Sequence, residues 1–193
     1  MEIRKRSISM ASENRTYTVE DIIALPEGQR AELFDGEMVM MASPATTHQG
    51  VLVWLLVEIS NHIREKKGKC QVLAAPLAVL LKDDGKNYLE PDIVVICDEK
   101  KLDDRGCHGA PDWVIEIVSP FSRKLDYGRK LTAYMEAGVR EYWIVDPEKQ
   151  AIVVYHPSQP DLPAVYRFGD SVKTDICEGL AIDSAPLGDI HYS

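Results

Sequence analysis

Two short runs, residues 92–97 and 113–118, constrain the fold more than any other feature of the sequence. Successive side chains of a β-strand point to opposite sides, so a strand with one wet face alternates between apolar and polar residues. Both runs are instead built largely from Val and Ile, which is typical of central strands that are covered on both faces. We therefore expect the two to be neighbours in one sheet, with helices packed on it.

Helical periodicity indicates what covers this sheet. Residues 47–66 form the clearest helix, because their apolar side chains recur every three or four positions; the stripe consists of Val51, Leu52, Leu55, Ile59 and Ile63. A second helix is expected over 125–137, where Gly138 can end it. A short helix over 17–25 opens with Thr18 and Asp21, a loose form of the capping box.

The remaining pattern predicts strands, a hairpin and one layered domain. Asp35 and Gly36 form a hairpin turn, preceded by a helical turn that contains Glu32. Residues 98–111 are expected to be a charged loop, and the tail after Ser171 has no assignment. Further strands are expected over 70–75, 77–82, 140–146, 151–155 and 164–168. The order favours a single α/β (α+β) domain over 17–193, a mixed sheet flanked by helices, after a flexible leader over 1–16.

Composition narrows the class of protein. A chain of 193 residues with 45% hydrophobic and 27% charged residues suits one globular domain. No apolar run is long enough for a membrane span, and no apolar stretch follows the basic start, so we expect a cytoplasmic protein without a signal peptide. In that setting Cys70, Cys97, Cys107 and Cys177 are expected to be free buried thiols, and their spacing does not indicate a zinc site.

The residues that stand out chemically are Asp92 and Glu116, each a carboxylate within a run of Val and Ile. Burial of an unpaired carboxylate costs several kcal/mol, roughly, so each acid requires a partner. One interpretation is a shared hard divalent cation such as Mg²⁺. The alternative is a structural salt bridge, or a strand-end carboxylate near solvent. Spacing alone does not separate the two.

A resemblance to a known family adds to this interpretation. Pro91-Asp92 followed by Glu116 resembles the Pro-Asp…(Asp/Glu)-x-Lys signature of the PD-(D/E)XK restriction-endonuclease-like nucleases. The wider pattern resembles the Uma-type family of proposed endonucleases. That pattern comprises GAPDWVIEIVSP at 109–120, then Asp126, Lys130 and Tyr134, then GVREYWIVDP at 138–147, with ELFDGE at 32–37 and His48 further upstream.

The resemblance implies a nuclease-like core with a site for Mg²⁺ or Mn²⁺ at Asp92 and Glu116, completed by Glu32. This chain departs from the superfamily pattern at Val118, two residues past Glu116, where a lysine is usual. We predict that Lys130 takes its place by running its stem along the core toward the strand carboxylates. The competing reading is an exposed Asp126–Lys130 ion pair. For Glu32, the competing reading is a solvated helix residue.

Two interpretations are open for His48. It either contacts phosphate or acts as an acid–base group, or it is a packing residue in the first turn of the helix. Arg123, Lys124, Arg129 and Arg140 are candidates to meet a phosphate backbone, although the net charge of −9 weighs against tight nonspecific DNA binding. The leading hypothesis is a DNA endonuclease, as a homodimer if both strands are cut. The rivals are a binding or assembly module that has lost catalysis and a hydrolase of another phosphodiester.

Overall fold

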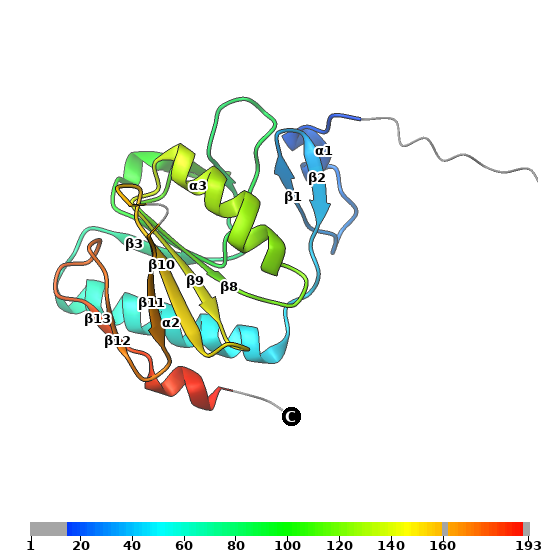
Figure 1. Cartoon of the computed structure of the whole chain (residues 1–193). Coiled ribbons are helices and arrows are strands. Elements are labelled where there is room, and N and C mark those ends of the chain that lie inside the picture. Colours follow the sequence, from blue (N-terminus) through cyan, green and yellow to red (C-terminus); the bar gives the residue numbers. More distant parts are fainter. Residues whose placement is uncertain (1–14, 160–161, 191–193) are drawn as a thin grey trace, which may run out of the picture.

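A six-stranded mixed sheet forms the centre of the computed structural model, which describes residues 15–159 and 162–190 (Figure 1). The strand order is β11-β10-β9-β8-β5-β3, and only the β8–β9 pair is parallel. These strands are β3 (Gln71–Ala74), β5 (Ile93–Ile96), β8 (Trp113–Ile117), β9 (Glu141–Asp146), β10 (Ala151–Tyr155) and β11 (Ala164–Arg167). The predicted fold class, with the two apolar runs as neighbouring strands, is confirmed.

Helices cover both faces of the sheet, as Figure 1 shows. Helix α2 (Thr46–Glu65) lies on one face, where its predicted stripe packs against Ile93, Ile115 and Trp143. On the other face lie η2 (Leu125–Lys130) and α3 (Leu131–Ala137), the crossover that the parallel β8–β9 pair requires. Trp113, Tyr142 and Trp143 are fully buried, as expected of core residues.

The second predicted helix is divided into two kinds of turn. Its first part, η2, is a π-helix, and only α3 is a regular α-helix, which Gly138 ends in the left-handed conformation at φ 88°. Hydrogen bonds in a π-helix span one residue more than in an α-helix, and such turns occur often at functional sites. Both Asp126 and Lys130 belong to this wider turn and are buried.

The N-terminal region corrects one expectation. Strands β1 (Ala31–Phe34) and β2 (Glu37–Met40) pair directly across Asp35 and Gly36, so Glu32 lies on a strand and not in a helical turn. Positive φ values at both turn residues, 49° and 83°, suit the tight turn that joins twisted strands. The short helix α1 (Val19–Ile23) precedes this hairpin and has the predicted capping box. Residues 1–14 of the expected leader lie outside the described residues.

Two other segments are more ordered than the sequence indicated. Residues 98–111 contain η1 (Glu99–Lys101) and the strands β6 (Leu102–Asp103) and β7 (Gly106–His108). Strand β7 pairs with β4 (Val79–Leu80). The tail forms a hairpin of β12 (Ser171–Lys173) and β13 (Ala181–Asp183), followed by η3 (Ala185–Asp189). Val172 and Ile182 of this hairpin join the α2 side of the core.

The expectation of four free thiols is wrong for two of them. Cys70 and Cys97 form a disulfide, because they flank the paired strands β3 and β5 directly opposite one another. Cys107 and Cys177 are free and buried, as expected. Within the described part of the chain, no helix has the length and apolar character that a membrane span needs.

Candidate active site

Strand pairing sets Asp92 and Glu116 against each other. Ile93 pairs with Ile115 in the antiparallel β5–β8 ladder, so the next position along brings Asp92 opposite Glu116. Side-chain alternation puts both acids on the η2 and α3 face, where Val94 and Val114 also point. Directly opposed positions hold Cβ atoms roughly 4.5–5.5 Å apart, so the two carboxylates belong to one site.

Asp92 is held by a backbone donor and a histidine. Its Oδ2 accepts a hydrogen bond from the Ile117 N–H at 2.7 Å and lies 3.1 Å from His48 Nε2. The Asp92 side chain stays 17% exposed, so it is the most accessible acid of the site. Burial lowers the pKa of His48, but the hydrogen bond and charge of Asp92 outweigh it and leave that pKa raised. His48 therefore bonds an acid of the site as well as packing in the first turn of α2.

Glu116 is buried beside a lysine and a tyrosine. Its Oε1 accepts hydrogen bonds from Lys130 Nζ at 3.0 Å and from the Tyr134 hydroxyl at 2.9 Å. Burial raises the pKa of Glu116 well above its ordinary value, and the neighbouring acids act in the same direction, whereas the Lys130 ammonium opposes them. Tyr134, a member of the Uma-type pattern, is thus a hydrogen-bond partner in the site as well as a buried residue of the second helix.

The Lys130 side chain points into the site and not toward solvent. Its ammonium lies 2.9 Å from Glu32 Oε1 and 3.7 Å from Asp126 Oδ1, besides Glu116, and the side chain is only 5% exposed. An exposed Asp126–Lys130 pair is therefore excluded. Burial alone lowers the pKa of Lys130, but the surrounding carboxylates raise it well above its ordinary value, so the amine is a protonated cation at neutral pH.

Glu32 reaches the same point from β1. Its carboxylate is 3% exposed, and its Oε1 also accepts the backbone N–H of Glu90 at 3.1 Å. The solvated alternative for Glu32 is therefore excluded.

Asp126 is a further member of the site; the sequence indicated it as part of the Uma-type pattern and as a possible ion-pair partner of Lys130, but not as a site residue. Both of its carboxylate oxygens are buried, and neither has a hydrogen-bond partner in the described part of the chain. Burial raises the pKa of Asp126 to about 6, despite the Lys130 ammonium, which lowers it. The available signal was its position four residues before Lys130 on the same predicted helix.

The acid cluster, defined here as Glu32, Asp92, Glu116 and Asp126, carries more negative charge than its cations offset. Four carboxylates face the Lys130 ammonium and the His48 imidazole. The orphaned oxygens of Asp126 and the all-oxygen donor set fit a hard divalent cation, for which carboxylates are the preferred protein ligands. The donor set therefore suits a hard divalent cation chemically, although among the described residues no three of these acids gather one oxygen each within 4.8 Å of one another.

The basic residues expected to meet phosphate are mostly paired with acids. Arg123 bonds Asp146 and Glu148, Arg129 lies 3.0 Å from Glu37, and Arg140 lies 3.0 Å from Asp112. Lys124 is exposed at the start of η2. These arginines are therefore largely neutralised.

Comparison with known proteins places the chain in a family. The sequence profile of the Uma2 family, described as "Putative restriction endonuclease", matches residues 19–185. The match covers most of the sequence, so the chain belongs to the Uma2 family. The predicted family is thereby confirmed.

One relative and one solved structure are also similar to this chain. A protein of Synechocystis sp. (strain ATCC 27184 / PCC 6803 / Kazusa), named "Uncharacterized protein slr1290", is 27% identical over 140 residues, which are 71% of this chain and 72% of that protein. The fold is similar to the crystal structure of "a putative nuclease belonging to DUF820" from Anabaena variabilis ATCC 29413. The TM-score is 0.73 at 21% identity, over 89% of this chain and 97% of that one.

Proposed function

We propose that this protein is a metal-dependent DNA endonuclease of the restriction-endonuclease-like class. The observation that carries the proposal is the buried Lys130 ammonium, 3.0 Å from Glu116 and supplied by the helix that follows the Glu116 strand. Val118, where the superfamily pattern has its lysine, is packed in the core with 6% exposure. Val118 cannot supply a positive charge next to Glu116. Lys130 supplies it instead, from the neighbouring helix.

In this proposal Asp92, Glu116 and Glu32 hold Mg²⁺ or Mn²⁺. Such an ion, when bound, polarises the scissile phosphate and activates water. The position of Asp92 directly before β5, opposite Glu116 on the neighbouring strand β8, supports this assignment. Asp92 is the most accessible of these acids, so the phosphate would approach from its side.

Lys130 and His48 take two different roles in hydrolysis. The water oxygen bonds to phosphorus and gives up one proton to solvent as the phosphodiester P–O bond breaks, and the leaving oxygen takes up a proton. The Lys130 ammonium offsets the negative charge that develops on the phosphate. Lys130, 3.0 Å from Glu116 and 2.9 Å from Glu32, is placed to position the attacking water beside these acids. His48, whose Nε2 lies 3.1 Å from Asp92 Oδ2, is the candidate donor of the proton.

The first prediction contrasts two variants in a plasmid-nicking assay with Mg²⁺ or Mn²⁺. Lys130→Ala should abolish cleavage and leave the metal-induced rise in melting temperature largely intact, because lysine is not a ligand. Asp92→Asn should lose both, because a ligand charge is gone. Lys173→Ala is the matched control, since this exposed lysine on β12 belongs neither to the acid cluster nor to the candidate phosphate contacts, and the variant should cleave like the wild type.

The outcomes separate the rival functions. Cleavage by Lys130→Ala at the wild-type rate would make Lys130 a structural residue and remove the central support of the proposal. Metal-induced stabilisation without cleavage of any DNA by the wild type would favour a binding or assembly module, which the paired arginines and the net charge also fit. Hydrolysis of small phosphodiesters without plasmid nicking would point to another substrate.

A further inference from the structure

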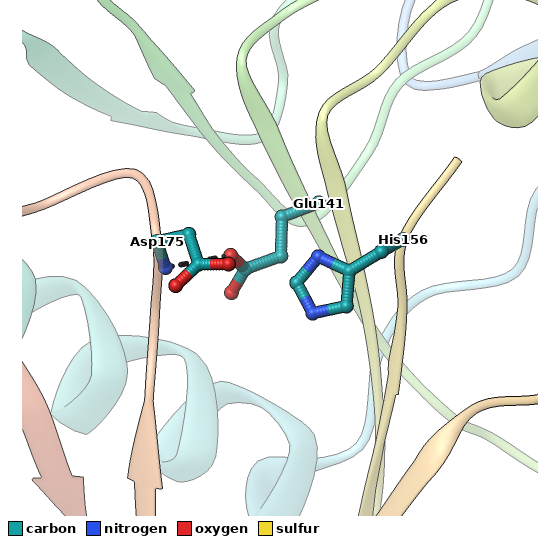
Figure 2. Close-up of side chains that lie close together, drawn as sticks. All are labelled: Glu141, His156 and Asp175. Carbon is teal, nitrogen blue, oxygen red and sulfur yellow. Dashed lines mark hydrogen bonds between the residues drawn. The ribbon is translucent and has the colours of Figure 1, made fainter. Parts of the chain in front are cut away.

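A second cluster of metal-binding side chains lies away from the acid cluster. It consists of Glu141, His156 and Asp175, whose ligand atoms all lie within 4.8 Å of one another. Figure 2 shows the Glu141 carboxylate between the Asp175 side chain and the His156 ring. Within the residues that the structure describes, no other group of three His, Cys, Asp or Glu side chains is gathered in this way.

Strand register builds the first half of this cluster. Tyr155 pairs with Tyr142 in the antiparallel β9–β10 ladder, so the next position brings His156 opposite Glu141. Glu141 alternates with Trp143 and so points to the α2 face, whereas Glu116 shares its face with Val114 and Val118. In the parallel β8–β9 pair, Glu141 lies beside Trp113 and Glu116 lies beside Ile144. The two clusters therefore occupy opposite faces and opposite ends of the sheet.

The C-terminal hairpin contributes the third ligand. Asp175 lies in the loop between β12 and β13, and its backbone N–H donates to Glu141 Oε2 at 2.9 Å. The Trp143 indole N–H donates to Glu141 Oε1 at 2.5 Å. These two donors orient the fully buried Glu141 carboxylate, as partners of a metal-ligating carboxylate do. His156 is partly exposed and Asp175 is exposed, so an ion can enter from solvent.

We propose that Glu141, His156 and Asp175 bind a first-row transition ion such as Zn²⁺ and thereby fasten the β12–β13 hairpin to the central sheet. Two carboxylates neutralise a divalent charge, and the imidazole selects for zinc-like ions over Mg²⁺. A tetrahedral ion keeps one position for water. Binding at this site does not depend on nuclease activity.

Tag-free Asp92→Asn/Glu116→Gln protein tests the proposal, because it removes two ligands of the proposed Mg²⁺ site. This background should retain one equivalent of Zn²⁺ after gel filtration, and its melting temperature should rise with Zn²⁺ but not with Mg²⁺. Adding His156→Ala or Asp175→Asn should weaken Zn²⁺ binding in calorimetry at least about tenfold. Asp175→Asn alters one exposed side chain and keeps the backbone donor to Glu141, so it tests the site even if His156→Ala folds poorly.

His62→Ala is the matched control, because His62 on α2 contacts the same loop through the Glu178 carbonyl without belonging to the cluster. It should bind Zn²⁺ like the background. Equal Zn²⁺ affinity in Asp175→Asn and the background would overturn the proposal, as would the absence of stoichiometric binding by the background itself. Neither result bears on cleavage, which Lys130→Ala tests separately.

Discussion

At the scale of single residues, the site depends on how one ammonium compensates several buried acids. Glu116 and Glu32 each bond Lys130, and these bonds offset the loss of hydration that burial imposes on all three groups. The Asp126 carboxylate is stabilised less, because its nearest cation is 3.7 Å away and its oxygens have no hydrogen-bond partner among the described residues. Ionised Asp126 therefore destabilises the metal-free fold.

This imbalance predicts a pH-dependent effect of Asp126→Asn in the presence of EDTA. The pKa of Asp126 is about 6 in the folded protein against an ordinary value of 3.8, so ionisation is penalised only in the folded state. The penalty is complete above pH 6, declines as the pH falls through that value, and is absent below 3.8. Asp126→Asn should therefore raise the free energy of unfolding by on the order of 2–3 kcal/mol at pH 8 and change it little at pH 3.5.

Urea denaturation of both proteins across this pH range provides the measurement. Asp103→Asn is the control for the direction of the effect. The Arg105 backbone N–H lowers the pKa of the exposed Asp103 carboxyl, so this substitution should not raise the free energy of unfolding at pH 8. A gain from Asp126→Asn that is the same at pH 3.5 and pH 8 would contradict the argument.

At the scale of elements, the strands β5 and β8 and the η2 turn place three members of the acid cluster, Asp92, Glu116 and Asp126, together with Lys130. The antiparallel ladder fixes which acids face each other, and the crossover from β8 to β9 returns over the same face with Lys130 on it. The outer edge of β5 is held by β3, and the Cys70–Cys97 disulfide joins these two strands. The disulfide thus stabilises β5, the strand that begins directly after Asp92.

We expect loss of this disulfide to weaken the fold. The bond closes a loop with a sequence separation of 27, for which the chain-entropy estimate is about 3–4 kcal/mol. Cys70→Ala/Cys97→Ala, or reductant, should lower the free energy of unfolding by roughly that amount in urea. Cys107→Ala serves as the control, because Cys107 is not part of the disulfide. Reductant should lower the free energy of unfolding of this variant by the same amount as in the wild type.

Thiol counting provides an independent check. The denatured, unreduced chain should show two free thiols, Cys107 and Cys177, and reductant should reveal the other two. Four reactive thiols without reductant would show that the bond does not form in the purified protein.

At the scale of the whole molecule, charge limits how nucleic acid can bind. The net charge is −9, and Arg123, Arg129 and Arg140 are engaged by acids. A phosphate backbone that approached the acid cluster without a metal ion would meet like charges. Duplex binding is therefore expected to depend on the divalent ion more than on basic side chains.

This charge balance predicts metal-dependent DNA affinity. Fluorescence anisotropy with a short duplex should show weak binding in EDTA and an affinity at least about tenfold higher with Ca²⁺, which supplies charge at an oxygen-ligand site. Asp92→Asn should remove most of the increase in affinity that Ca²⁺ produces. In Lys124→Ala, the ratio of the affinity with Ca²⁺ to the affinity in EDTA should stay the same. Equal affinity with and without Ca²⁺ would refute metal-mediated binding. Light scattering on the same samples would test the proposed homodimer.

The sequence by itself determined the elements whose signals are local or periodic. The apolar runs 92–97 and 113–118, the stripe of α2, and the turns at Asp35 and Gly138 reflect side-chain alternation and backbone preferences that act over a few residues. Asp92 and Glu116 stood out for the same reason, as charges inside apolar strands. The family pattern then directed attention to Lys130 and Glu32.

Only the tertiary structure decided which distant groups meet. The meeting of Glu32 with Lys130 and the Cys70–Cys97 bond depend on contacts between segments far apart in the chain. The same packing leaves the Asp126 oxygens without a hydrogen-bond partner among the described residues. The joining of Glu141, His156 and Asp175 depends on strand register and on a hairpin that the sequence pattern did not reveal. Such contacts are set by packing of the whole core, because local preferences do not fix which strand or loop becomes a neighbour.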